Sequence, residues 1–283
     1  MMRLLLIILV CVATTANAQS ISAGEAIAKI RARYPATPNP NTVDTIKAGD
    51  PSTQVTGIAV TFMDTMEMLR EAARRGDNLV ITHEPTFYNH PDDVSQFVND
   101  PVYKEKLAFI KQHHMVIFRL HDAIHQQKPD PFPIALAGVL GWEKYVNPAT
   151  PHVLDIPAIS LRDLVRQVQA KLHSHTLRVI GDPSMIVTHV SLYPGASGLA
   201  KHVFALNANE HEVLLAGEAQ EWETVVYAQD AVIEGRPKAL LLLGHKISEE
   251  PGMEVCAKEL REVFPNTRID HIPTPQPFWD NKE

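Results

Sequence analysis

Three apolar segments of the sequence each run into a histidine that has a further metal-ligating side chain close behind it. The three sets are His83 with Glu84, His121 with Asp122 and His125, and His245 with Glu249. Imidazole and carboxylate are ligands that divalent transition metals accept in proteins, and residues four apart lie on one face of a helix. These residue types in this spacing could therefore hold one or two metal ions.

The elements that must position these histidines are strands. Segments 79–82, 116–120 and 239–243 have the length and the apolar character of buried strands, and helical patterns alternate with strand patterns along the chain. This alternation predicts an α/β fold with mostly parallel strands. In open α/β sheets, ligands bind beyond the carboxyl ends of the strands. The three histidines would converge on one spot if these three strands are neighbours.

The other histidines carry weaker signals. A single histidine at a strand end is often a solvated loop residue, so a purely structural role for all of them stays open. His113 and His114 end a predicted helix, where cations are favoured for electrostatic reasons. His90 and His152 are among those that have no ligand-like neighbours in the sequence.

Two local patterns mark the starts and turns of elements. Asp64 precedes a helical pattern that reaches Arg75, and we expect it to cap that helix. The turn that contains Gly195 and Gly198 would either cradle a phosphate or serve only as a tight turn.

The first 18 residues have the pattern of a secretory signal peptide. Arg3 is followed by an apolar run, and Ala16-Asn17-Ala18 is an A-x-A cleavage site. The run is too short for a permanent anchor, and no later segment approaches the roughly 20 apolar residues of a membrane span. We therefore expect a periplasmic or secreted protein, cleaved after Ala18. Its one remaining cysteine, Cys256, cannot form an internal disulfide.

The charge of the chain argues against one class of partner. The net charge is −7 and no dense basic run occurs, so the sequence lacks the usual signature of a nucleic-acid-binding protein.

The pattern of predicted helices and strands changes near residue 148. We therefore expect a metal-binding α/β domain made of 19–147 and 222–283, with a second α/β domain, 148–221, inserted into it.

Five motifs, taken in order, are similar to those of one family. They are Ile81–Phe87 (ITHEPTF), Leu120–His125 (LHDAIH), Leu177–Gly181 with Ile186–Gly198, Leu215–Glu218 (LAGE), and Gly244–Glu249 (GHKISE). The chain resembles the Nif-three-like dinuclear-metal family, the homologues of GTP cyclohydrolase I type 2. The resemblance implies a fold of two α/β halves with mixed sheets, and a metal site at the carboxyl ends of strands. It also implies a homo-oligomer, in this family often a ring-shaped hexamer.

The resemblance assigns metal-ligand positions residue by residue. They fall on His83, Glu84, His125, His245 and Glu249. Glu84 stands where the family has a second histidine, and His125 stands where it has an aspartate. Each change replaces one competent ligand type by another, so metal binding is expected to persist while the charge of the site is redistributed.

The expected function is metal-dependent hydrolysis of an unknown small-molecule substrate. About two ions of Zn, Mn or Fe would activate a water molecule, and His121 or Asp122 would move its proton. Export argues against GTP as the substrate. The alternative is a non-catalytic periplasmic protein that binds or buffers metal, which a closed coordination shell would favour over an open one.

Overall fold

The computed structural model describes residues 21–174, 177–207 and 212–278 of the chain. The expected signal peptide, residues 1–18, lies outside these ranges. Within them, no helix combines the length and the apolar character that a membrane crossing requires.

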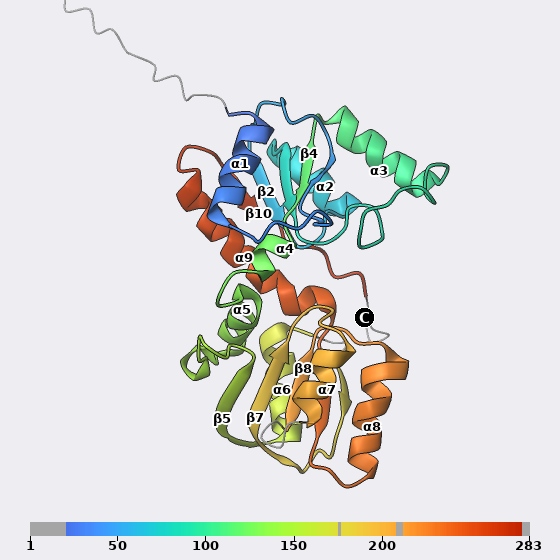
Figure 1. Cartoon of the computed structure of the whole chain (residues 1–283), viewed down its shortest axis with the longest axis vertical. Coiled ribbons are helices and arrows are strands. Elements are labelled where there is room, and N and C mark those ends of the chain that lie inside the picture. The colour runs from blue at the N-terminus through green and yellow to red at the C-terminus, as the bar shows by residue number, and fades with distance from the viewer. Residues whose placement is uncertain (1–20, 175–176, 208–211, 279–283) are drawn as a thin grey trace, which may run out of the picture.

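Two α/β units lie end to end along the long axis of the molecule (Figure 1). The first unit contains a five-stranded sheet in the order β1-β4-β3-β2-β10. Its strands are β1 (Ile46–Ala48), β2 (Ile58–Thr61), β3 (Leu79–Thr82), β4 (Val116–Arg119) and β10 (Ile269–His271). The last four are parallel to one another, and β1 joins the edge in the antiparallel sense. Every residue of β2, β3 and β4 is buried, as expected when both faces of a parallel sheet are covered.

Helices cover both faces of this first sheet. They are α1 (Ala23–Arg33), α2 (Met66–Arg75), α3 (Pro101–Gln112), the single-turn α4 (Asp122–His125) and α9 (His245–Val263). Helices α1 and α9 share one apolar core with Val60 and Phe118 of the sheet. Helices α2 and α3 share another core with Val80 and Ile117 on the opposite face.

The start of α2 differs from the expectation by one residue. Thr65, not Asp64, caps the helix, and its hydroxyl accepts a hydrogen bond from the Met68 amide at 3.3 Å. Asp64 is instead buried and lies 3.3 Å from the ammonium group of Lys106. A carboxylate taken up by a buried ion pair is not available as a cap.

The second unit contains another five-stranded sheet, in the order β5-β7-β8-β9-β6. Its strands are β5 (Val153–Ser160), β6 (Arg178–Ile180), β7 (Ile186–Tyr193), β8 (Val213–Ala216) and β9 (Ala239–Leu242). The central three are parallel, and the two edge strands are antiparallel. The helices are α5 (Pro131–Leu140), α6 (Leu161–Leu172), α7 (Leu199–Asn207) and α8 (Val226–Ile233), with short turns η1 (Glu143–Tyr145) and η2 (Glu221–Val225). The predicted α/β class, with two halves and mixed sheets, is confirmed.

The second unit is larger than the inserted segment 148–221 that the sequence suggested. Helix α5 packs on the second sheet through Leu136 and Leu140, and β9 pairs with β8 and β6 in that sheet. The strand before His245 is therefore not a neighbour of the strands before His83 and His121. The apolar pattern of β9 matches that of β3 and β4, so its local sequence does not reveal which sheet it joins.

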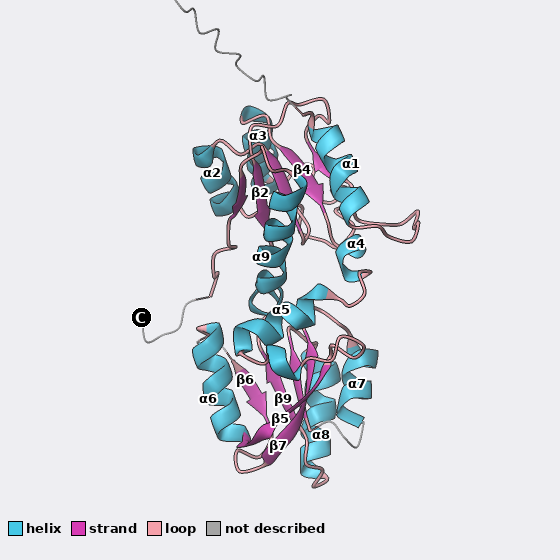
Figure 2. Ribbon diagram, turned by 90° about the vertical axis from the view of Figure 1, so that its left-hand side faces the viewer, coloured by secondary structure: helices cyan, strands magenta, loops and turns pink. Residues whose placement is uncertain are grey.

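Helix α9 connects the two units (Figure 2). It begins directly after β9, at the edge of the second unit, and its later residues Cys256, Ala257 and Leu260 are buried in the core of the first. The first turn of α9 thus lies at the junction of the units, where strands β3 and β4 also end.

Candidate metal centre

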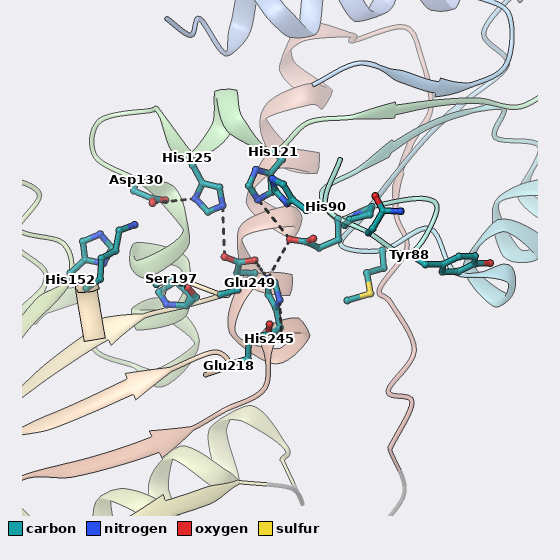
Figure 3. Close-up of a pocket in the computed structure, with 17 residues that line it drawn as sticks. Tyr88, His90, His121, His125, Asp130, His152, Ser197, Glu218, His245 and Glu249 are labelled. Carbon is teal, nitrogen blue, oxygen red and sulfur yellow. Dashed lines mark hydrogen bonds and ion pairs between the residues drawn. The ribbon is translucent and has the colours of Figure 1, made fainter. Parts of the chain in front are cut away.

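The chain brings all three predicted sets of side chains to this junction. Figure 3 shows His121, His125, His245 and Glu249 there. Strands β3 and β4 are parallel neighbours, so His83 and His121 leave the same edge of the first sheet. The single turn of α4 then carries His125 back toward them, and the His121 and His125 ring centroids lie 4.8 Å apart. Convergence arises because α9 starts at this edge, not because three strands are neighbours.

Glu249 lies among three imidazoles. Its Oε2 atom is 2.9 Å from Nε2 of His245 and 3.6 Å from Nε2 of His83. Its Oε1 atom is 3.8 Å from Nε2 of His125. The side chain is 3% exposed, so both oxygens face the cluster rather than water.

Glu84 supplies the second carboxylate, from the other side of the cluster. Its Oε1 atom is 3.3 Å from Nε2 of His245 and 3.8 Å from Nε2 of His121. Burial would raise the pKa of Glu84, but the hydrogen bond and charge of His245, with the charges of His121 and Arg119, hold it below its ordinary value. Glu84 is therefore an ionised ligand candidate at neutral pH.

The four imidazoles share one orientation: Nδ1 is bonded outward and Nε2 faces the cluster. The Nδ1 partners are the Leu120 carbonyl for His83 (3.0 Å), Asp122 for His121 (3.0 Å), Asp130 for His125 (3.4 Å) and Glu218 for His245 (3.4 Å). Metal-binding histidines almost always have such an acceptor on the far nitrogen, because it fixes the tautomer and the direction of the ring. This orientation leaves the four Nε2 atoms facing a cluster whose side chains could hold a metal ion.

His83 provides a test of whether a metal ion fits. The residue is fully buried, and its Nε2 atom has no hydrogen-bond partner within the described residues. Burial, with the charges of His121 and His125, lowers its pKa well below the ordinary value. A buried neutral imidazole with a lone pair and no partner is costly unless something binds it, and a metal ion is what four imidazoles and two carboxylates suit.

The protonation of His245 partly offsets the negative charge of the nearby carboxylates. Burial opposes its protonation, but Glu218, Glu249 and Glu84 together raise its pKa to about 12. The imidazolium form neutralises part of the carboxylate charge when no ion is bound. A bound metal ion would replace that proton.

Two overlapping groups of side chains could hold a metal ion. One is His83, His121 and His125, and the other is His83, Glu84 and Glu249. Within each group the possible ligand atoms lie within 4.8 Å of one another. His121 therefore lies in the inner cluster with the five expected ligands.

Asp122 lies behind the cluster. Besides the Nδ1 atom of His121, it accepts hydrogen bonds from the Thr42 hydroxyl at 2.8 Å and from the Val43 amide at 3.3 Å. Burial would raise the pKa of Asp122, but these hydrogen bonds and the charge of His121 hold it below its ordinary value. Its position is that of a group that orients His121.

Several residues of the site were not anticipated from the sequence. They are Asp44, Arg119, Asp130 and Glu218. Asp44 accepts hydrogen bonds from the amides of His121, Asp122 and Ala123 at 2.8–2.9 Å, which caps α4. The sequence does hold weak signals, because Arg119 interrupts an apolar strand and Asp130 precedes a proline as helix caps often do.

The turn around Gly195 has a role that the sequence did not suggest. Gly195 has a φ of +66°, and a Cβ atom at this position would collide with the carboxylate of Glu249. The Gly195 amide donates to the Ser248 hydroxyl at 3.0 Å. The missing side chain thus makes room for a candidate ligand. A Cβ atom on Gly198 would meet nothing within 4 Å.

A cavity of about 710 Å³ opens beside the cluster, between the two units. The first unit contributes Tyr88 and His90, and the second contributes His152, Ser197 and Lys201. The His152 ring stacks on Tyr193 at 4.7 Å, and its Nδ1 atom lies 2.7 Å from the Leu192 carbonyl. Two histidines without ligand-like neighbours in the sequence therefore line the space next to the candidate metal centre.

Residues 41–277 match the Duf34/NIF3 family, whose description reads NGG1p interacting factor 3. The chain belongs to this family. Similar solved structures include Staphylococcus aureus protein SA1388, at 16% identity over 92% of this chain and 99% of that one, with a TM-score of 0.73. A Bacillus cereus protein related to NIF3 has 14% identity over 92% and 99%, with a TM-score of 0.72.

Reduced HcgD from Methanocaldococcus jannaschii is a further structural neighbour in this set. It shares 14% identity over 88% of this chain and 97% of its own, with a TM-score of 0.65. No curated protein matches the sequence. At these identities the likeness establishes the fold, and with the family match it confirms the Nif-three-like membership that the motifs predicted.

Proposed function

We propose that this NIF3-family protein is a metal-dependent hydrolase of a small molecule. The observation that carries the proposal is the convergence of four imidazoles and two glutamates beside a cavity of about 710 Å³. Five of these six side chains line the cavity, and the sixth, His83, is buried with no hydrogen-bond partner for its Nε2 atom within the described residues. Cavities of this size, with a few convergent polar groups, are typical of small-molecule sites.

The side chains that would hold the metal are His83, Glu84, His125, His245 and Glu249, joined by His121. Ions of Zn, Mn or Fe suit imidazole and carboxylate donors. Six such donors are enough for about two ions per chain, of which only one can bind the single free nitrogen of His83. Bound there, such ions would lower the pKa of a water molecule and polarise the scissile group.

The geometry favours His121 as a ligand and Asp122 as the group that orients it, rather than as proton carriers. Another side chain of the cavity, which is not a proposed metal ligand, must then transfer the proton. His152 is suited to it, because its Nδ1–H donates to the Leu192 carbonyl and leaves the lone pair on Nε2. Tyr193 stacks on the ring and holds it in place.

A non-catalytic metal-buffering role is the alternative. It requires no space for a substrate, whereas the cluster here borders a cavity that both units line. The cavity is the reason we prefer the enzyme.

The proposal includes export after cleavage at Ala18 and assembly into a homo-oligomer such as a hexamer. Exposed apolar side chains on the second unit support self-association, since Phe204, Trp222 and Ile233 are 67%, 75% and 74% exposed. Light scattering on the mature chain, beside Trp222→Glu, tests the assembly, and N-terminal sequencing of exported protein tests the cleavage.

The decisive experiment is metal content by mass spectrometry on untagged chain 19–283, purified without chelator. We expect close to two equivalents of metal, lost in His245→Ala but kept in the cavity control His152→Ala. A screen of small esters, amides and phosphoesters should then show turnover that wild type has and both variants lack. Absence of stoichiometric metal after reconstitution would refute the hydrolase and the buffer alike, and metal without any turnover would favour the buffer.

A further inference from the structure

Arg119 is a fully buried cation that lies next to the candidate metal centre, within ion-pair distance of Glu84. It ends β4, two residues before His121, and is 0% exposed. Burying a guanidinium group is costly unless its N–H groups are paired. Its partners therefore show what it holds in place.

Two of these partners are backbone carbonyls of the segment that follows β3. Nε donates to the His83 carbonyl at 2.9 Å, and Nη1 donates to the carbonyl of His90. The planar fork of the guanidinium thus spans both ends of the segment that contains Glu84 and forms one wall of the cavity.

Nη2 also lies 3.5 Å from Nδ1 of His90. Two further partners are carboxylates. Nη2 lies 3.5 Å from Oε2 of Glu84, and Nη1 lies 3.5 Å from Oδ2 of Asp92. Asp92 has a second cation, because Lys47 lies 3.2 Å from the same oxygen. Among the lysines and arginines of the described residues, only Arg119 lies within ion-pair distance of Glu84.

This contact makes the two glutamates of the centre unequal. Both oxygens of Glu249 face imidazoles. In Glu84 only Oε1 faces imidazoles, those of His121 and His245, while Oε2 faces Arg119.

We propose that Arg119 is a positioning residue of the metal centre: it holds Oε2 of Glu84, so that Glu84 binds metal through Oε1 alone, between His121 and His245. The inference rests on the proposed metal-dependent function and goes beyond it. Without Arg119, the carboxylate is free to turn and bind an ion through both oxygens, which changes the coordination number.

A merely structural role for Arg119 is the competing explanation, and the chain offers a matched control for it. Lys106 is a buried cation that anchors the same segment at the Thr86 carbonyl, at 2.7 Å, and pairs with Asp64 at 3.3 Å. Within the described residues, its hydrogen bonds and its ion pair involve no proposed ligand. Lys106→Met should therefore lower stability without altering the metal centre.

The test is titration of wild type, Arg119→Lys, Arg119→Met and Lys106→Met with Co²⁺, whose visible absorption bands report coordination. Lysine keeps the charge but loses the fork. We expect the Arg119 variants to bind Co²⁺ about 10–100-fold more weakly and with shifted bands, and Lys106→Met to keep the wild-type bands and affinity. Folded Arg119 variants with wild-type bands and affinity would overturn the inference.

A second variant leaves Arg119 in place, so it tests the role of Arg119 even if the Arg119→Lys and Arg119→Met proteins do not fold. In Glu84→Gln, the guanidinium can pair only with the amide oxygen, so the amide NH₂ group is turned toward the ions and cannot bind them. We expect Glu84→Gln to bind Co²⁺ no better than Glu84→Ala. Clearly tighter binding by Glu84→Gln would refute the role of Arg119, whereas failure of wild type to bind Co²⁺ would instead refute the proposed function.

Discussion

Each imidazole of the centre is held at Nδ1 by a different element, and this outer bond should control metal affinity. Asp130 is the clearest case, because its Oδ2 faces His125 while its Oδ1 accepts the Phe132 amide and caps α5. Asp130→Asn keeps the capping oxygen but places an NH₂ group against the Nδ1–H of His125. We expect metal affinity to fall about 10–100-fold, measured by competition with a chromophoric chelator.

The matched control is Asp100→Asn, which changes the cap of α3 away from the centre. It should leave metal affinity unchanged. Equal affinity in Asp130→Asn and wild type would show that His125 does not need its outer partner.

His202 should contribute to the acid sensitivity of the fold. It is 1% exposed on α7, its Nδ1 atom contacts the Thr224 hydroxyl at 2.9 Å, and its Nε2 atom has no partner within the described residues. Burial, with the charge of Lys201, lowers its pKa, and the Tyr193 ring packs nearby. In the unfolded chain this histidine has a pKa of about 6.5. Below that pH the unfolded chain therefore binds a proton that the folded chain does not bind.

Stability should accordingly fall as the pH drops below about 6.5, by at most about 1.4 kcal/mol per pH unit from this residue. His202→Gln removes the titrating group. Urea unfolding at pH 7.5 and 5.0 should show a smaller loss of unfolding free energy for the variant than for wild type. Identical losses in the two proteins would contradict this assignment.

Residue types and short spacings were enough to predict the inner cluster, because His83 with Glu84 and His245 with Glu249 are local pairs. The outer partners were not predictable in the same way. Glu218 and Asp130 reach the histidines from other elements, and nothing in their local sequence shows that contact. His121 was expected to reach the same spot because it follows a strand, but its expected role there was proton transfer rather than metal binding.

At the scale of elements, the turn after β7 should act on the centre through space rather than through a ligand of its own. An alanine at position 195 would push its Cβ atom into the Glu249 carboxylate. We expect Gly195→Ala to lose most metal binding, measured by metal content after dialysis. The positive φ adds a stability cost of about 1–2 kcal/mol.

Gly198→Ala separates these two effects. Its φ of +87° carries a similar backbone penalty, but its Cβ atom would meet nothing within 4 Å. It should lose a comparable amount of stability and keep its metal. Metal loss in both variants would mean that strain in the turn, not contact with Glu249, is responsible.

Element starts were predictable where a cap is purely local. The side chains of Ser22, Asp100 and Ser160 each accept a hydrogen bond from a backbone amide only two or three residues later. Asp64 shows the limit of this reasoning, because its buried pairing with Lys106 is a long-range contact. Strand pairing has the same limit: β9 has the apolar pattern of β3 and β4 but joins the other sheet.

At the scale of the molecule, the centre is assembled from both units, and metal should therefore fasten them together. Four candidate ligands leave the first sheet, while His245 and Glu249 stand where α9 leaves the second unit, with Glu218 of that unit behind His245. A ligand that binds only the folded form stabilises it by about 4 kcal/mol at 1,000 times its dissociation constant. The sequence could not reveal this arrangement, because it depends on which sheet β9 joins.

Removing the metal with a chelator should therefore lower the melting temperature and loosen both sides of the junction at once. Hydrogen exchange should quicken at the amides of α4 and of the first turn of α9, while exchange in β2 and β7, inside the two cores, stays slow. His245→Ala should exchange like the chelated protein and show no response to added metal. Faster exchange on one side alone would mean that the ion belongs to a single unit, and the cavity between the units would then need no metal to keep its shape.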